Sequence, residues 1–296
     1  MLLPKFDYHA PTTLEEACSL KGRYGEKARC LAGGTDLLVN LKKKVIAPEQ
    51  LISLKRIEGL AETSHQKGEG VFIGPLCTAA YLAGSGLIRE KVPVLGEGAG
   101  RLGSPLIRNR ATVGGNLVTA RPASDMAPPL LVLGAVVVLK SAKGERRVLL
   151  KEFIHGPGQT AIGSDEIMVR IVIPAYEGLS AGSYIKLGSR KALEISLVNV
   201  ASFMAMGSDG TIKEARVALG AVAPTPMLAP SAEAILKGAK PKGESDAVFK
   251  EAARTAAQDA KPIDDHRGSA EYRRAMVEVL TLRTLVTSYK QLMKNA

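Results

Sequence analysis

Two short glycine-containing stretches carry the residues best suited to hold an anionic ligand. Residues 31–37 read Leu-Ala-Gly-Gly-Thr-Asp-Leu, and residues 112–117 read Thr-Val-Gly-Gly-Asn-Leu. Glycine lacks a Cβ atom, so its backbone can adopt positive φ and approach a ligand closely. Successive backbone N–H groups in such a loop form a partly positive concavity for an anion, and Thr35, Thr112 and Asn116 add side-chain donors. Two such loops facing one another could hold a diphosphate from both sides.

The same stretches are also compatible with two ordinary turns, because paired glycines commonly mark loops. Neither stretch matches the dinucleotide-binding fingerprint or the P-loop, since no lysine followed by serine or threonine comes after the glycines in the P-loop order. The local sequence therefore predicts an anion-binding cradle and leaves plain turns open as the alternative.

No acid, base, nucleophile or metal-ligand set accompanies the two loops. The four histidines lack the helical spacing of metal ligands. The three cysteines, Cys18, Cys30 and Cys77, form no Cys-x-x-Cys pair. We therefore expect neither a metal site nor a serine-hydrolase nucleophile. An anion cradle without catalytic groups fits an electron carrier, in which a bound cofactor supplies the chemistry.

Two further polar residues could complete such a site, and each has a simpler alternative. Asp125 could accept hydrogen bonds from sugar hydroxyls, or it could cap the turn or helix that follows it. Lys186 follows a strand-like segment and could place positive charge beside a reduced, anionic ring; a solvated surface lysine is the alternative. Leu102 and Met168 read as plain core residues from the local sequence.

Composition and charge exclude several classes of protein. The chain has 296 residues, enough for two domains or one large one with subdomains, and a formal charge of +11 that is spread along its length. Aromatic residues make up 4% and tryptophan is absent, which argues against a nucleic-acid binder. No apolar run reaches the length of a membrane helix. The scattered cysteines indicate reduced thiols and predict a cytoplasmic protein.

The first loop is expected within an α/β unit. A helix is predicted to begin at Thr12 or Thr13 and to stop near Gly22. A strand at 27–31 would deliver the loop, and a helix at 36–43 would follow it, so that its N-terminus also favours an anion. A second strand is predicted at 51–54.

The second loop is expected among short helices and strands. The sequence predicts a strand at 70–74, helices at 78–83 and 94–102, and a hairpin of strands 136–140 and 147–150. The apolar stretch 130–139 reads as a turn into a buried strand, and 166–173 as a further strand.

The last third is expected to hold a small sheet followed by helices. Residues 177–182 read as a linker. Strands are predicted at 197–206 and 212–219, joined by a turn with Asp-Gly, which is a good hairpin signal. Helices are predicted at 231–236, 247–259 and 269–293.

Four stretches in this order resemble the FAD-binding medium subunit of the molybdenum hydroxylases, the family of carbon monoxide dehydrogenase and xanthine dehydrogenase. The first two are residues 31–38 and 107–117, which contain the two glycine loops. The third, 122–130, reads Pro-Ala-Ser-Asp-Met-Ala-Pro-Pro-Leu, and the fourth, 262–273, reads Pro-Ile-Asp-Asp-His-Arg-Gly-Ser-Ala-Glu-Tyr-Arg. The resemblance runs from about Phe6 to Leu292.

The resemblance implies that both loops bind the diphosphate of FAD. It also implies that Asp125 contacts the cofactor, that Lys186 contacts the flavin, and that Leu102 and Met168 approach the flavin ring. Leu102 stands where the xanthine dehydrogenase branch has an aromatic residue and offers less stacking area. The loop residues so implied are Cys30, Leu31, Ala32, Gly33, Gly34, Thr35, Asp36, Leu37, Thr112, Val113, Gly114, Gly115 and Asn116.

The resemblance further implies an α+β fold and a three-subunit enzyme. Two α/β FAD-binding subdomains of the vanillyl-alcohol-oxidase type, at 1–60 and 61–176, would precede a C-terminal domain at 177–296 with a small antiparallel sheet and helices. A small subunit with two [2Fe-2S] clusters would pass electrons to FAD, and a large subunit would carry molybdopterin and substrate. The acceptor would be NAD, a quinone or another molecule. The alternatives are a self-sufficient FAD-dependent oxidoreductase and a flavin-free assembly module.

Overall fold

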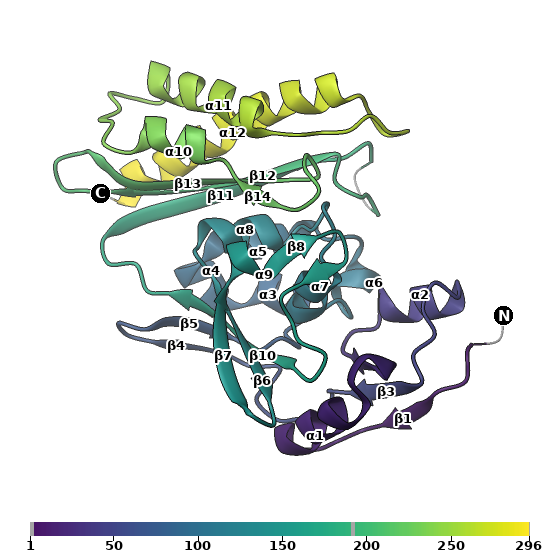
Figure 1. Cartoon of the computed structure of the whole chain (residues 1–296). Coiled ribbons are helices and arrows are strands. Elements are labelled where there is room, and N and C mark those ends of the chain that lie inside the picture. The colour runs from purple at the N-terminus through teal and green to yellow at the C-terminus, as the bar shows by residue number, and fades with distance from the viewer. Residues whose placement is uncertain (1–2, 191–192, 296) are drawn as a thin grey trace.

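The structure is a computed structural model that describes residues 3–190 and 193–295. Three sheets and their helices form successive layers, with the N-terminal unit at one end and the C-terminal helices at the other (Figure 1). A two-stranded ribbon lies beside the middle unit. The α+β class is confirmed.

The N-terminal unit is a parallel three-stranded sheet of order β1-β3-β2. Helix α1 begins after Thr13, whose side chain accepts a hydrogen bond from the backbone N–H of Glu16. The helix runs through Gly22 and ends before Gly25, which adopts a φ of 52°. The helix thus continues two residues past Gly22, near which it was predicted to stop, because Gly25 is the glycine that takes a positive φ. The elements are β1 (Asp7–His9), α1 (Leu14–Tyr24), a 3-10 turn (Gly25–Lys27), β2 (Ala28–Leu31), α2 (Leu37–Lys42) and β3 (Gln50–Ser53).

The middle unit is an antiparallel sheet of order β4-β5-β10-β6-β7, with short helices packed on it. Its strands are β4 (Thr63–Gln66), β5 (Gly70–Ile73), β6 (Val136–Ser141), β7 (Gly144–Leu149) and β10 (Ile167–Pro174). Its helices are α3 (Ala79–Gly84), α4 (Gly86–Lys91), α5 (Pro93–Arg101), α6 (Pro105–Arg108), α7 (Val113–Thr119), α8 (Ala127–Val132) and α9 (Leu150–Phe153). The ribbon pairs β8 (Ile154–Gly156) with β9 (Gln159–Thr160).

The apolar stretch 130–139 divides between two elements. Residues 130–132 end α8, and the strand β6 begins only at Val136. The expectation of a turn leading into a strand missed the helix. Pro128 and Pro129 lie in its first turn, where proline is tolerated because no intrahelical N–H bond is lost.

The C-terminal unit is an antiparallel sheet of order β11-β12-β13-β14, with the helices of the same unit on one face. Strand β11 begins inside the predicted linker 177–182. A Cβ atom at Gly182 would lie 2.8 Å from the carbonyl oxygen of Ser202, so this glycine permits close strand packing and is not a flexible link. The elements are β11 (Leu179–Leu187), β12 (Val198–Met206), β13 (Ile212–Gly220), β14 (Met227–Leu228), α10 (Pro230–Leu236), α11 (Ala247–Asp259) and α12 (Ala270–Asn295).

The sheet β11–β14 is covered on both faces. Helix α12 packs on β11 and β12 from one side, and α5 and α8 pack on the sheet from the other (Figure 1). Tyr184, Ala201 and Phe203 of this sheet therefore belong to the same buried cluster as the helices of the middle unit. The domain boundaries at 60/61 and 176/177 stay predictions, and the apolar core runs across the second of them.

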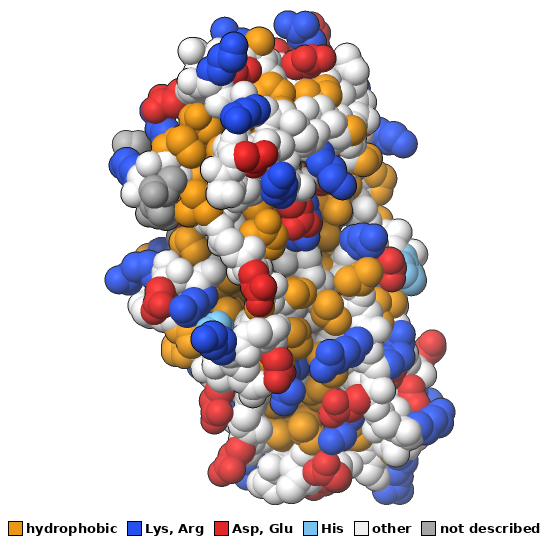
Figure 2. Space-filling view, turned by 90° about the vertical axis from the view of Figure 1, so that its left-hand side faces the viewer, with side chains coloured by type: hydrophobic (Ala, Val, Ile, Leu, Met, Phe, Trp, Pro, Cys, Tyr) orange, Lys and Arg blue, Asp and Glu red, His pale blue; other side chains and the backbone are white. Residues whose placement is uncertain are grey.

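The surface carries its charges in a mixed pattern. On the face in Figure 2, Lys and Arg side chains are scattered among Asp and Glu and do not gather in one patch. Across the described ranges, no helix combines the length and apolar character needed to cross a membrane.

Candidate functional site

The two glycine loops lie against each other. A Cβ atom built on Gly33 would lie 1.8 Å from the carbonyl oxygen of Arg110 and 3.3 Å from the Cα of Ala111. The backbone of the first loop therefore rests on the segment that leads directly into Thr112 and the second loop. Only glycine allows this approach, so the pair of loops is assembled by a contact between residues far apart in the sequence.

The first loop presents backbone N–H groups without protein partners. Gly34 adopts a φ of 79°, a conformation that favours glycine. Among the described residues, the N–H groups of Gly33, Gly34, Thr35 and Asp36 donate to no protein acceptor, and all four residues are half-buried. Successive free N–H groups in a partly enclosed loop form a concavity that favours an anion, so this set of donors fits an anionic ligand.

Asp36 brings a negative charge to the same loop, and two neighbours offset it. Its carboxylate lies 3.5 Å from the guanidinium of Arg121 and accepts a 2.9 Å hydrogen bond from Asn40. Arg121 follows α7, so the ion pair also joins the two loop regions. The carboxylate is thus engaged by the protein and is not left to repel an anion.

The second loop differs from the predicted nest, because its backbone N–H groups are already used. It forms the first turn of α7 and is capped by Thr112, whose Oγ1 accepts from the N–H of Gly115. The N–H groups of Val113, Gly114 and Asn116 donate to the carbonyl oxygens of Cys77, Pro75 and Thr112, respectively. The expectation that the second loop would also present free backbone N–H groups was therefore wrong.

Side chains remain as the donors of the second loop. The Oδ1 atom of Asn116 accepts a 2.5 Å hydrogen bond from Ser124, which fixes the amide and leaves its NH2 group available. The Thr112 hydroxyl accepts from a backbone N–H and keeps its own proton to donate. The glycine at 114 serves packing, since a Cβ atom there would lie 2.6 Å from Pro75.

Cys30 and the other residues flanking the first loop position it and carry no reactive group. Cys30 and Leu31 end β2, Ala32 follows it, and Leu37 begins α2. Burial raises the pKa of the Cys30 thiol to about 11, so it stays protonated at neutral pH. Helix α2 spans only six residues, so its dipole adds little to the N–H groups.

Asp125 and Lys186 lie together at the junction of the middle and C-terminal units. Their charged atoms are 2.7 Å apart, and their side chains are 7% and 8% exposed, respectively. Both simple alternatives are excluded: Lys186 is not a solvated surface lysine, and the side chain of Asp125 caps no helix, because Ser124 accepts from the N–H of Ala127 instead. Whether either residue touches a cofactor stays a prediction.

Leu102 and Met168 are both buried in the core of the middle unit, at 8% and 4% exposure. Leu102 caps the end of α5, and its carbonyl oxygen accepts from Arg108 at 3.0 Å. Met168 pairs with Leu139 in the sheet. Their contact with a flavin ring also stays a prediction.

The local sequence alone did not single out Tyr184, Ser196 or Arg121. Tyr184 and Ser196 donate hydrogen bonds to Asp125. The signal for Tyr184 was present, because residues two apart on a strand point to the same face, and Tyr184 precedes Lys186 by two. Nothing local marks Ser196, since only the fold brings it to Asp125.

One pentapeptide of the Gly-x-Ser-x-Gly kind, at 178–182, is not a hydrolase site. Its Ser180 lies within β11 and pairs with Ala205, whereas a nucleophile elbow needs a sharp turn from strand to helix. Among the described residues, no histidine hydrogen-bonds to Ser180. The described chain also holds no group of three or more His, Cys, Asp or Glu side chains placed to bind a metal.

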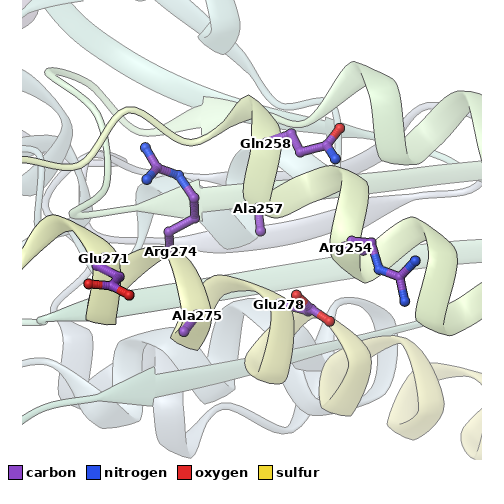
Figure 3. Close-up of a pocket in the computed structure, with 7 residues that line it drawn as sticks. All are labelled: Arg254, Ala257, Gln258, Glu271, Arg274, Ala275 and Glu278. Atoms are coloured by element: carbon purple, nitrogen blue, oxygen red, sulfur yellow. The ribbon is translucent and has the colours of Figure 1, made fainter.

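Two surface hollows lie away from the loops. One is a groove between α11 and α12, lined by Arg254 of α11 and by Glu271, Arg274 and Glu278 of α12 (Figure 3). The other lies at the edge strand β1. Neither hollow is lined by any of the predicted site residues. In the groove between α11 and α12, the two arginines and the two glutamates balance in charge.

Comparison with known families gives two matches that together span most of the chain. Residues 4–176 match the FAD binding domain in molybdopterin dehydrogenase, and residues 183–288 match the CO dehydrogenase flavoprotein C-terminal domain. The chain belongs to the FAD-binding subunits of the molybdenum hydroxylase family. The resemblance seen in its sequence is thus confirmed, and the chain is an oxidoreductase flavoprotein subunit with an FAD-binding domain.

Curated relatives match over nearly their whole length. The carbon monoxide dehydrogenase medium chain of Hydrogenophaga pseudoflava is 33% identical over 289 residues, covering 96% of this chain and 97% of the relative. The nicotine 6-hydroxylase medium subunit of Paenarthrobacter nicotinovorans is 30% identical over 287 residues, covering 97% and 98%.

Solved structures share the fold. The carbon monoxide dehydrogenase from Hydrogenophaga pseudoflava that lacks the Mo-pyranopterin moiety matches with a TM-score of 0.92 and 33% identity, covering 98% of this chain and 99% of that one. Quinoline 2-oxidoreductase from Pseudomonas putida 86 matches with a TM-score of 0.90 and 28% identity, covering 99% and 100%.

The local geometry fits the diphosphate of FAD at the first loop. The unpartnered N–H groups of residues 33–36 supply donors, Asp36 is offset by Arg121, and Thr112 and Asn116 supply side-chain donors from the facing loop. The arrangement is asymmetric: backbone donors come from one loop and side-chain donors from the other.

Proposed function

We propose that this chain is the electron-transfer subunit of a molybdopterin-dependent hydroxylase or dehydrogenase. Electrons would come from the [2Fe-2S] clusters of a small partner subunit, and a large partner subunit would carry molybdopterin and the organic substrate. FAD on this chain would pass the electrons to an acceptor such as NAD or a quinone. The names of the relatives, which are medium chains and subunits of carbon monoxide dehydrogenase and nicotine 6-hydroxylase, support this division of work.

The observation that carries the proposal is the pair of loops packed at Gly33 and Arg110, with the N–H groups of residues 33–36 unpartnered. Bound there, FAD would supply the redox chemistry, accepting electrons and releasing them to the acceptor. The first loop would hold the diphosphate by its N–H groups. Thr112 and Asn116 would add hydrogen bonds from the second loop.

The partners follow from what the described residues lack. They contain no metal-ligand cluster, so iron–sulfur clusters and molybdenum are assigned to other chains. We also propose a cytoplasmic location, in keeping with three free cysteines of which two are buried.

The test is co-expression with candidate small and large subunits encoded nearby, followed by size-exclusion chromatography, metal analysis and anaerobic addition of substrate. We expect a three-subunit complex whose flavin band bleaches on substrate addition, and an isolated chain with at most dye-reducing activity from a reduced nucleotide. A chain that stays alone and oxidises an organic substrate with only FAD bound would instead support a self-sufficient oxidoreductase. A chain that joins the complex but never takes up FAD would support an assembly module.

A further inference from the structure

All three protons of the Lys186 ammonium group are accepted by the protein. The Nζ atom donates to the carbonyl oxygen of Arg101 at 3.2 Å, to Oδ2 of Asp125 at 2.7 Å and to the carbonyl oxygen of Glu194 at 2.9 Å. A lysine ammonium has three donors and no acceptor, so this geometry leaves no proton for a ligand. The side chain of Lys186 is 8% exposed, so these three hydrogen bonds compensate the cost of burying its charge.

Asp125 is equally occupied. Its Oδ1 atom accepts from the Tyr184 hydroxyl and from Ser196 Oγ, both at 2.8 Å, while Oδ2 accepts from Lys186. Burial raises the pKa of Tyr184 well above its usual value, so the phenol keeps the proton that it donates. The two hydroxyl groups fix one carboxylate oxygen and thereby aim the other at Lys186.

The two carbonyl oxygens that Lys186 binds belong to two backbone segments that meet. The first, residues 101–103, ends α5 and contains Leu102, and the second, residues 193–196, precedes β12. The N–H of Leu193 donates to the carbonyl oxygen of Gly103 at 3.4 Å, and Leu193 holds a φ of 55°, which is unfavourable for a leucine. Lys186 donates to a carbonyl oxygen in each segment, so it links the two segments to each other.

We propose that Asp125 and Lys186 are positioning residues that fix segments 101–103 and 193–196 beside the flavin ring, and that Tyr184 and Ser196 orient Asp125 for this. The pair acts on the cofactor through the backbone and not by a direct hydrogen bond from Lys186. The proposal rests on the proposed function for the presence of FAD, and on the family resemblance for placing the ring beside Leu102. The tie between the two segments is a property of the chain with or without FAD.

The test compares Lys186→Met, Asp125→Asn and the double variant in the full-length protein. Hydrogen exchange at Leu193 should become at least roughly tenfold faster in each single variant without FAD, because a buried pair that loses one member no longer holds its surroundings. The dissociation constant of FAD should rise by a similar factor in both single variants. The visible absorption band of the flavin should shift in the same way in both. The double variant should match the single ones, because the residues act as one unit.

Milder and matched variants keep the test decisive if the buried changes prevent folding. Tyr184→Phe and Ser196→Ala should produce the same changes at a smaller size, and Lys213→Met, at an exposed lysine of the same sheet, should produce none. The proposal would be overturned if only Lys186→Met changed the FAD affinity and the flavin band, while hydrogen exchange at Leu193 stayed unaltered in every variant. That result would favour direct contact between Lys186 and the flavin. Wild-type protein that binds no FAD would contradict the proposed function. The exchange data at Leu193 would still test whether Asp125 and Lys186 hold segments 101–103 and 193–196 together.

Discussion

At the scale of single residues, one glycine of each pair makes room for another segment of the protein. The missing side chain of Gly33 makes room for the backbone at Arg110, and that of Gly114 makes room for Pro75. The sequence was enough to predict the positions at which the backbone must lack a Cβ atom. It could not predict that protein fills the space at both positions, because those neighbours come from segments remote in the sequence. A valine at either position would therefore disturb the fold itself.

Gly33→Ala is expected to lower stability and FAD affinity together. The new Cβ atom would overlap the carbonyl oxygen of Arg110, so the loops must separate, at a cost of about 2 kcal/mol in unfolding free energy. Thermal melts without FAD and fluorescence titration with FAD measure the two effects. Gly22→Ala, inside α1 where a Cβ atom meets nothing within 4 Å, is the control and should not lower the melting temperature. An unchanged melting temperature for Gly33→Ala would contradict the packing of the two loops.

Thr35→Val is expected to weaken FAD binding alone. Among the described residues, the Thr35 hydroxyl makes no hydrogen bond within the protein, so its loss removes only a donor to the ligand. We expect the dissociation constant of FAD to rise about fivefold, the value of one modest hydrogen bond. The melting temperature without FAD should stay at the wild-type value, as it should in Thr12→Val. Equal FAD affinity in Thr35→Val and wild type would remove this hydroxyl from the site.

At the scale of elements, most helices and strands could be predicted from periodicity and turn residues. The hairpin of β6 and β7 was predicted around Lys143-Gly144, and β12 and β13 were predicted from two apolar runs joined by an Asp-Gly turn. The errors arose where one residue type has two uses: Gly182 looked like a linker residue but permits strand packing, and the prolines before 130 masked a buried helix. Long-range pairing, such as β10 between β5 and β6, leaves no local signal.

The Arg146–Glu166 pair, which joins β7 to the start of β10, predicts a pH-dependent stability. Arg146 donates to both carboxylate oxygens, at 2.6 and 2.7 Å, and the side chain of Glu166 is 12% exposed. The hydrogen bonds from Arg146 hold the pKa of Glu166 below its ordinary value of 4.5. A lowered carboxyl pKa contributes stability above the unfolded pKa, and this contribution is lost as pH falls through the folded pKa.

Arg146→Met should therefore destabilise the protein by about 1 kcal/mol at pH 7. The difference from wild type should shrink as pH falls below 4.5 and Glu166 takes up a proton in both proteins. Denaturant unfolding at several pH values measures this. Arg147→Met, at the neighbouring exposed position, serves as the control. A difference that stays constant from neutral to acid pH would show that the charge of Glu166 is not involved.

At the scale of the whole molecule, the units are joined by shared core. Residues of β11, β12 and β13 pack with α5, α8 and β10 in one buried cluster, and Glu97 of α5 accepts a 2.7 Å hydrogen bond from the N–H of Tyr184. The sequence predicted the order of the units and the glycine loops, because these depend on local patterns. It did not predict the Asp125–Lys186 cluster as an interaction, because its members come together only when β11 packs on the middle unit.

A chain ending at residue 176 is therefore expected not to fold into a stable unit. Removing the C-terminal sheet would expose the apolar faces of α5 and α8 and leave Asp125 without its three side-chain donors. We expect aggregation, or strong binding of an apolar dye such as ANS, where the full chain shows little. A soluble 1–176 fragment with a cooperative melt would show that the middle unit holds together without the C-terminal sheet.

The asymmetry of the two loops offers the most direct measurement of how FAD is held. Hydrogen exchange of the full chain is followed with and without saturating FAD. The N–H groups of residues 33–36 lack protein partners and should become strongly protected when FAD binds, whereas those of residues 113–116, already bonded to Cys77, Pro75 and Thr112, should change little. Protection that appears elsewhere, with exchange at residues 33–36 unchanged by FAD, would contradict the account.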